Sequence, residues 1–197
     1  MKKKVLIAVF ALAVCVMAGG CTNAEKKAEN DGAKTKASPA SDFTVEYGST
    51  ECFISEYIGS DTEIVIPEEI NGKKVVWLRS TSFNQNTSII SVHIPDGVDT
   101  IDKNAFGGCT NLTSVYIPDT VFIIGVAAFA QCTSLTTINI PKDITYISDW
   151  LFFGCSSLTS IEIPDNITTI GFRAFNNCSS LTSITIPDSV TYIMNAP

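Results

Sequence analysis

The sequence predicts an α/β solenoid rich in β-strand, with parallel strands on one face and short strands and helical turns on the other. First, the dipeptide Ile-Pro recurs at a first interval of 28 residues and then four times at 23 residues. Second, seven apolar positions return with the 23-residue period. Third, apolar and polar residues alternate before each proline. A fixed period of about 20 to 29 residues is typical of solenoids whose turns stack on one another. The prolines are Pro67, Pro95, Pro118, Pro141, Pro164 and Pro187.

Each turn begins with a strand, because alternation at period two gives one buried face and one exposed face. Proline then ends the strand, since it has no amide hydrogen to donate to a ladder. A Val-x-x-Ile segment predicts a second short extended piece, and small polar residues with Ala-Phe favour a tight helical turn. We expect one phenylalanine per turn to fill the interior as an aromatic stack, formed by Phe106, Phe129, Phe152 and Phe175.

The two ends of the repeat array differ. Five residues are inserted around Asn71-Gly72, a strong hairpin signal, so we expect a β-hairpin and an N-terminal cap over 43–75. At the other end the last repeat, within 43–197, is incomplete, which predicts an open edge. Solenoids normally need a capping repeat at each end. A partner, a folded-back tail or a longer native chain would each provide that cover.

The N-terminal residues have the features of an export signal. Residues 1–20 combine three lysines with a short apolar run and predict a signal peptide, and Ala18-Gly19-Gly20-Cys21 resembles the bacterial lipobox, which implies lipidation at Cys21. The polar stretch 21–42 predicts a flexible tether. Cleavage before Cys21 removes three of the 13 basic residues and gives a net charge of 10 − 20 = −10. Such an acidic protein is a poor partner for nucleic acid.

The pattern Ile-Pro-Asp-x-Val-Thr-x-Ile-Gly-x-x-Ala-Phe-x-x-Cys-x-Ser-Leu-Thr-Ser-Ile is nearly complete in the segment 163–184, where Ile167 stands in place of the valine. This pattern resembles the BspA-like subgroup of bacterial leucine-rich repeat proteins, and the resemblance extends over about residues 43 to 193. It implies a leucine-rich repeat solenoid exposed at the cell surface and associated with adhesion. It implies no catalytic residue. The first turn departs from the pattern, with Asn86 in place of the cysteine.

One cysteine per turn forms a column, Cys109, Cys132, Cys155 and Cys178. Parallel side chains on stacked turns do not favour a disulfide, and a row of thiols does not converge as zinc requires. We therefore interpret these residues and Cys52 as buried thiols, and we expect no metal and no cofactor. His93, the only histidine, has no distinctive nucleophile beside it, so we expect no enzyme.

An outward-facing column varies while the buried positions stay fixed. Each of its members lies between two buried strand residues, and this strip is the candidate ligand-binding site: His93, Tyr116, Asn139, Glu162 and Thr185. The alternative interpretation is a merely solvated column. The aromatic residues Phe122, Tyr146, Trp150 and Tyr192 are additional candidate interface anchors. Asp96, Asp119, Asp165 and Asp188 follow the prolines, where turn formation is favoured over a calcium ladder.

These observations predict a lipoprotein anchored to a membrane at the bacterial cell surface or outer envelope. Its repeat domain would bind extracellular or host proteins or glycans noncovalently, as an adhesin or interaction module. The alternative is a structural module that self-associates when its open C-terminal edge stacks on another chain.

Overall fold

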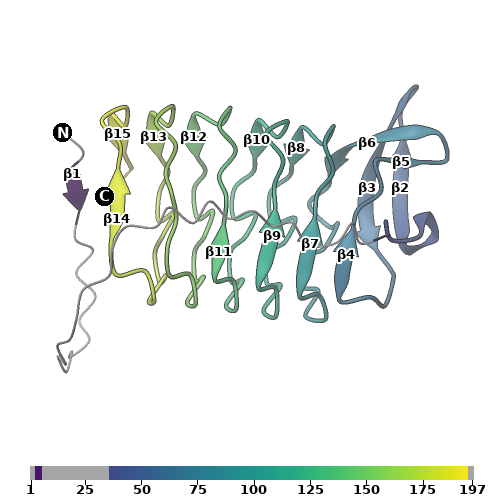
Figure 1. The fold of residues 1–197 in the computed structure, drawn as a ribbon, viewed down its shortest axis with the longest axis horizontal. Helices are drawn as coiled ribbons and strands as arrows, with labels where there is room; N and C mark the ends of the chain where they lie inside the picture. The colour runs from purple at the N-terminus through teal and green to yellow at the C-terminus, as the bar shows by residue number, and fades with distance from the viewer. Residues whose placement is uncertain (1–2, 6–35, 195–197) are drawn as a thin grey trace.

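The computed structural model describes residues 3–5 and 36–194, and Figure 1 shows them as a rod of stacked turns. Residues 3–5 form β1 (Lys3–Val5), which is antiparallel to β14 (Ile184–Ile186). The rest of the predicted signal peptide, Cys21 and most of the predicted tether lie outside the described residues. Within the described part, no helix has the length and apolar character needed to cross a membrane.

One side of the rod is a parallel four-stranded sheet, in the order β11-β9-β7-β4. Its strands pair in register, so that residues 23 positions apart lie side by side, as Val92 and Val115 do. The alternation predicted for these strands is confirmed, because the central residue of each three-residue strand is buried between more exposed neighbours. The strands are β4 (Glu63–Val65), β7 (Ser91–His93), β9 (Ser114–Tyr116) and β11 (Thr137–Ile138).

A second side carries two sheets. One has six strands, in the order β10-β8-β6-β3-β2 with β5 beside β6, and the other has the order β12-β13-β15. The two sheets are separate, so the hydrogen-bond ladder on this side is interrupted between β10 and β12. Their strands are β2 (Phe43–Tyr47), β3 (Glu51–Tyr57), β5 (Glu69–Ile70), β6 (Lys73–Leu78), β8 (Thr100–Ile101), β10 (Ile123–Ile124), β12 (Tyr146–Ile147), β13 (Thr169–Ile170) and β15 (Tyr192–Ile193).

The third side consists of the segments before each cysteine. The predicted helical turns take the form of single hydrogen-bonded turns, as where the Cys109 N–H donates to the Phe106 carbonyl at 3.1 Å. These turns are joined along the rod, because the Phe106 N–H donates to the carbonyl of Ala128 in the next turn at 2.9 Å. Of the described residues, only Ala40–Asp42 form a helix, the 3-10 helix η1. The fold is therefore a β-solenoid with few helical residues, and the predicted solenoid class is confirmed.

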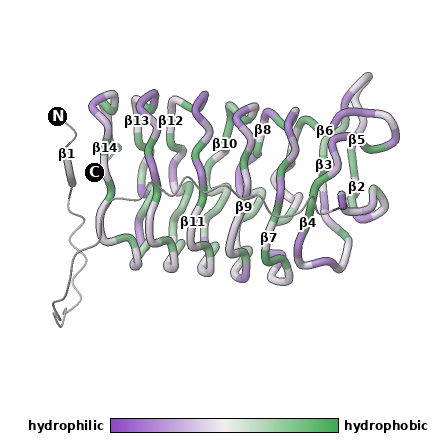
Figure 2. Tube along the Cα trace, in the orientation of Figure 1, coloured by the Kyte–Doolittle hydropathy of each residue, from purple (hydrophilic) through white to green (hydrophobic). Residues whose placement is uncertain are grey.

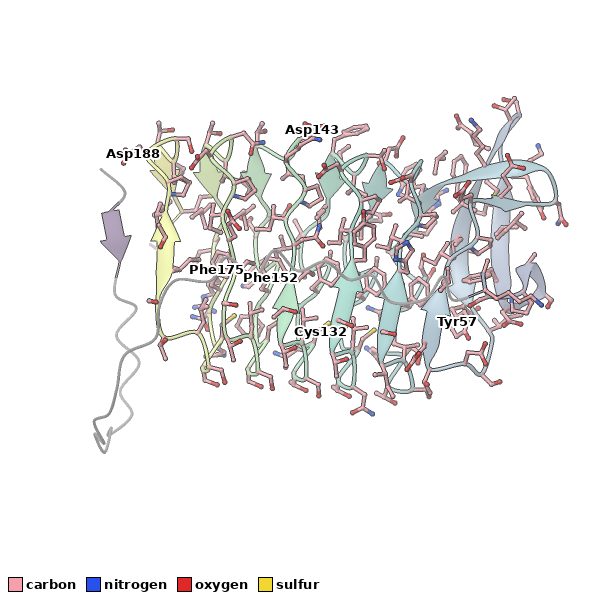
Figure 3. All side chains as sticks on the ribbon, viewed as in Figure 1. Tyr57, Cys132, Asp143, Phe152, Phe175 and Asp188 are labelled. Atoms are coloured by element: carbon pink, nitrogen blue, oxygen red, sulfur yellow. The ribbon has the colours of Figure 1, made fainter. Side chains whose placement is uncertain are left out.

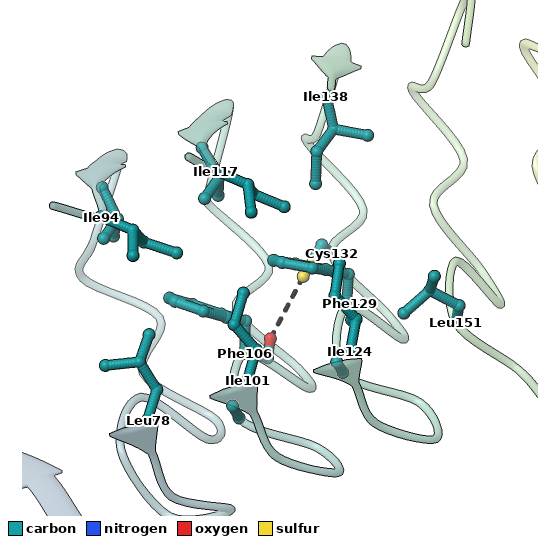
Figure 4. Packing of buried hydrophobic residues seen from close by; sticks show 14 of the residues in the cluster. Leu78, Ile94, Ile101, Phe106, Ile117, Ile124, Phe129, Cys132, Ile138 and Leu151 are labelled. Atoms are coloured by element: carbon teal, nitrogen blue, oxygen red, sulfur yellow. Dashed lines mark hydrogen bonds between the residues drawn. The ribbon is translucent and has the colours of Figure 1, made fainter. Parts of the chain in front are cut away.

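Repeated apolar side chains fill the interior, and Figure 2 shows hydrophobic residues recurring from turn to turn. The predicted phenylalanine stack is confirmed: the Phe83 and Phe106 rings lie 4.9 Å apart at 5°, and the Phe106 and Phe129 rings lie 5.1 Å apart at 8°. The stack continues through Phe152 to Phe175. Figure 4 shows it between columns of aliphatic residues from the two strand-bearing sides. Each turn therefore buries its apolar face only because a neighbouring turn covers it.

The N-terminal end is closed. Strands β2 and β3 pair antiparallel, and Tyr57 of β3 stacks on Phe83 with ring centres 5.7 Å apart. The predicted hairpin at Asn71-Gly72 is confirmed, since β5 and β6 pair antiparallel on either side of it. Both turn residues have left-handed backbone conformations, with φ of 53° and 74°, as a tight hairpin turn requires.

Candidate binding surface

The predicted strip lies along the side of the rod that carries β7 and β9, and all five of its side chains are exposed. His93 and Tyr116 lie opposite each other on these two strands. Their rings stack face to face, with centres 4.6 Å apart and planes inclined by 6°. The two residues form a flat platform that faces solvent, and a flat exposed ring pair is suited to contact with an apolar or planar group of a ligand.

Asn139 has a structural role in the same strip. Its Oδ1 accepts a hydrogen bond from the Ile117 N–H at 3.1 Å, and its Nδ2 donates to the Ile117 carbonyl at 2.6 Å. The side chain thus takes the place of the backbone pairing that would otherwise continue the ladder. Because Oδ1 and Nδ2 are both engaged, Asn139 fixes the end of the platform and has fewer hydrogen-bonding positions left for a ligand.

Glu162 and Thr185, the last two members of the strip, line one hollow of about 440 Å³. The hollow forms where the ladder on this side stops, because residues 161–163 belong to no strand. Asp165 lies in the same wall, so the hollow is acidic. The strip therefore has two distinct halves, an aromatic platform at His93 and Tyr116 and an acidic hollow at Glu162 and Thr185.

Hydroxyl groups beside the strip tie successive turns together. Thr113 donates from its Oγ1 to the Ile90 carbonyl, Thr136 donates to the Thr113 carbonyl, and Thr159 donates to the Thr136 carbonyl, at 3.0 to 3.4 Å. Each bond joins residues one turn apart. This row of hydroxyl–carbonyl bonds accounts for the repeated threonines, and it holds the strip in a fixed geometry without a ligand.

The cysteine column is buried, and its thiols are free. Each Sγ–H donates to a phenylalanine carbonyl of the preceding turn, as Cys132 does to Phe106 at 3.2 Å (Figure 4). Burial raises the pKa of the Cys109 thiol to about 12 and that of Cys132 well above its ordinary value. Thiols held in their neutral form are poor nucleophiles and poor metal ligands. Among residues 36–194, no group of His, Cys, Asp and Glu side chains converges as a metal site would.

The additional aromatic candidates lie on the side of the rod that carries β10 and β12. Phe122, Trp150 and Tyr192 are exposed, whereas Tyr146 is half-buried and its hydroxyl donates to Asp149 at 2.8 Å. Sequence reasoning missed Val126 and Phe172, which lie on the same side. Their signal was available, because each replaces the charged residues Lys103 and Asp149 of equivalent positions in other turns.

Comparison with known proteins agrees with this architecture. A family model described as the BspA type leucine-rich repeat region matches residues 77–196 in six copies. The chain therefore belongs to the BspA-type leucine-rich repeat family, whose members are generally non-enzymatic binding modules. No curated protein matches significantly.

Three solved structures of similar proteins illustrate the relationship. The leucine-rich repeat protein of T. pallidum is 29% identical, with a TM-score of 0.74 over 82% of this chain and 83% of that one. A leucine-rich cell surface protein of Faecalibacterium prausnitzii is 27% identical, with a TM-score of 0.61 over 82% of this chain and 51% of that one. A leucine-rich repeat protein of Eubacterium ventriosum is 28% identical, with a TM-score of 0.63 over 73% and 38%. The chain thus spans about half the length or less of the last two.

Proposed function

We propose that this chain is a cell-surface lipoprotein whose repeat domain binds protein or glycan ligands noncovalently, as an adhesin or interaction module. The binding site is the strip formed by His93, Tyr116, Asn139, Glu162 and Thr185. The observation that carries the proposal is the exposed His93–Tyr116 ring stack, 4.6 Å between centres, on a sheet whose geometry is held by hydroxyl ladders. Solenoids commonly bind through such an extended sheet surface.

Location at the cell surface is supported by two observations. The similar protein of F. prausnitzii is described as a cell surface protein. The sequence Ala18-Gly19-Gly20-Cys21 has the form of a lipidation signal. The anchor is tested by expressing the full chain and its Cys21→Ser variant in bacteria fed a fatty-acid analogue. Label and membrane association should both be lost in the variant, and retention of both by Cys21→Ser would refute the anchor.

Binding is tested by exposing the full chain to a glycan array and to a panel of purified extracellular matrix proteins. A double variant, His93→Thr with Tyr116→Thr, removes the ring platform. Threonine is the matched choice because Thr185 occupies the equivalent exposed position in a later turn. The matched control, Thr137→Ser, leaves the platform intact. We expect the double variant alone to lose its ligand. Binding that survives in the double variant would place the ligand elsewhere.

A second candidate function is assembly through the C-terminal end, because that end exposes apolar residues. Tyr192 is 59% exposed and Ile193 is 44% exposed, while Phe175, the last ring of the stack, is only half-buried. Sedimentation at high protein concentration decides this candidate. A concentration-dependent dimer that Ile193→Lys abolishes supports stacking of two chains, and a strict monomer excludes it.

A further inference from the structure

One backbone donor recurs on the side of the rod that carries β7 and β9. It is the N–H of the isoleucine before each repeat proline, and it is directed toward the following turn. Ile66 donates to the His93 carbonyl at 3.0 Å. Ile94 donates to the Tyr116 carbonyl at 3.1 Å. Where the ladder reaches Asn139, the side-chain amide takes the place of that carbonyl. Each of these turns therefore presents a donor that the next turn satisfies.

Ile186 of β14 has the same position in the last turn on this side. Within residues 36–194, no later turn supplies a strand here, so the repeat itself provides no partner for the outer edge of β14. Ile184 is buried and Ile186 is half-buried, and backbone polar groups at such positions need hydrogen-bond partners. A strand edge with unpaired N–H and C=O groups is a template for the addition of another strand.

The strand β1 occupies this edge. It comes from the other end of the chain and pairs antiparallel with all three residues of β14, with Lys3 opposite Ile186. The other ladders on this side are parallel, so β1 does not continue the repeat. Figure 1 shows β1 beside β14, and Figure 3 shows Phe175 near this end of the rod and Tyr57 at the other. The edge therefore accepts a strand from outside the repeat array, at the uncapped end of the aromatic stack.

The inner edge of β14 is not joined to the rest of the sheet. Residues 161–163 of the preceding turn form no strand, and β14 forms a two-stranded sheet with β1. Glu162 and Thr185 line the hollow of about 440 Å³ that lies there instead. The exposed carboxylate of Glu162, one turn from Thr185, favours a positively charged residue in an added strand. The sequence of β1 has this chemistry, because Lys4 is the residue opposite Thr185 in the register.

We propose that the outer edge of β14 is a site for β-strand addition, where an extended segment of a partner protein binds with a lysine or arginine opposite Thr185. Main-chain hydrogen bonds supply the affinity in this mode of binding. In the uncleaved chain Lys3–Val5 fills the site. In the lipoprotein proposed above, cleavage before Cys21 removes that strand and opens the edge, and this step alone rests on the proposed function. A second copy is disfavoured by charge, because residues 36–194 carry 7 basic and 17 acidic side chains, a net charge of 7 − 17 = −10.

Hydrogen exchange of the uncleaved full chain, made by cell-free translation without membranes, tests whether β1 covers the edge. The proline variant, Lys3→Pro with Val5→Pro, removes two backbone N–H groups of β1 and disrupts its pairing with β14. The alanine variant, Lys3→Ala with Val5→Ala, is the matched control that keeps both. We expect the Ile186 amide to exchange about tenfold faster or more in the proline variant and at an unchanged rate in the alanine variant. The Ile94 amide, inside the ladder, should not change in either.

A synthetic peptide of residues 2–7, Lys-Lys-Lys-Val-Leu-Ile, tests the site with an external strand. It is titrated against the proline variant, whose edge is open, and backbone amide chemical shifts are followed. Saturable shifts should concentrate at residues 184–186, and a peptide with proline in place of Lys3 and Val5 should cause none. Adding Glu162→Gln to the protein should weaken binding about twofold to fivefold, and high salt should weaken it too. Adding His93→Thr with Tyr116→Thr should leave it unchanged, which separates this site from the ring platform.

Three results would overturn the proposal. Equal exchange of the Ile186 amide in the full chain and the proline variant would show that β1 does not cover β14. Peptide-induced shifts that lie away from residues 184–186, or that the proline-containing peptide reproduces, would show that the edge does not accept a strand. Sedimentation that shows a dimer of the proline variant, dissociated by the peptide, would identify a second copy as the occupant of the edge.

Discussion

The two ends of the solenoid present the same kind of turn in different surroundings. At the N-terminal end, Tyr57 covers Phe83, which is 1% exposed, and the antiparallel strands β2 and β3 close the sheet. At the C-terminal end, β1 pairs with β14, but Phe175 remains half-buried at the end of the stack and Tyr192 is 59% exposed. Turns of the same repeat are therefore stabilised unequally. In a stacked array, the stability of a turn is determined largely by its neighbours.

The largest expected effect separates the middle of the stack from its open end. Phe129 is fully buried between Phe106 and Phe152, so Phe129→Ala should lower the free energy of unfolding by about 3–5 kcal/mol. Phe175→Ala removes the same atoms from a half-buried site with one ring neighbour and should cost about half as much. Urea denaturation followed by circular dichroism measures both. Equal losses would show that the open end is covered in solution.

Alkaline pH should destabilise the fold through the cysteine column. Burial raises the pKa of Cys109 to about 12 and that of Cys178 to about 11, so the unfolded chain loses its thiol protons first. The contribution of the thiols to the free energy of unfolding is therefore fully present below about pH 9. It is lost as pH rises toward the folded-state pKa values, by up to about 1.4 kcal/mol per pH unit for each thiol.

Unfolding free energies at pH 8 and pH 10 measure this effect. The Cys178→Ala variant, with one thiol fewer, should show a shallower dependence than the unmodified chain. Because both proteins contain the same tyrosines, which titrate in a similar pH range, the difference between their pH dependences reports on the Cys178 thiol alone. The same slope in both proteins would mean that Cys178 is not held neutral in the fold.

A smaller effect compares one tyrosine at each end. The Tyr57 hydroxyl accepts a hydrogen bond from the Asp61 N–H at 3.0 Å and donates to the Asp61 carbonyl at 3.2 Å. Tyr57→Phe should therefore cost about 1 kcal/mol. The exposed Tyr192 is its matched control, and Tyr192→Phe should leave the thermal midpoint unchanged. A larger loss at Tyr192 than at Tyr57 would reverse the assignment of closed and open ends.

The smallest expected effect is a gain in stability. Trp150→Asn replaces a bulky residue in the left-handed region, which should stabilise the fold by about 1–2 kcal/mol, and removes an edge-on aromatic pair worth about 0.5–1.5 kcal/mol. The two contributions largely offset each other, so the net gain in the free energy of unfolding should be about 0.5 kcal/mol in chemical denaturation. Trp77→Phe is a control that leaves the left-handed backbone untouched. A clear loss of stability in Trp150→Asn would mean that the indole contributes to folding rather than to binding.

The interior of the solenoid follows from sequence because every buried column repeats. The 23-residue period placed Phe106 and Phe129 in one stack, and the Asn71-Gly72 insertion that lengthens the first interval predicted the hairpin; the structure agrees with both. The outward column could also be identified, since exposure follows from alternation on the strand. These features follow from which residue types recur at equivalent positions of successive turns, and the sequence shows that recurrence directly.

Features that depend on how successive turns sit on one another were not predicted. Examples are the interruption of the ladder at residues 161–163 and the folding of Asn139 back onto Ile117. Small shifts between stacked turns decide these features, and residue type alone does not encode them.

Native-state hydrogen exchange tests the difference between the two ends most directly. The amides of Phe83 and Phe106, which donate to the next turn along the rod, should exchange slowest. The amides of Thr191 and Met194, which donate to the turn before their own, should exchange fastest. Exchange rates should increase gradually from the first pair to the second. Uniform protection from Phe83 to Met194 would contradict the account, because it would show that the C-terminal turn is as well covered as the capped N-terminal one.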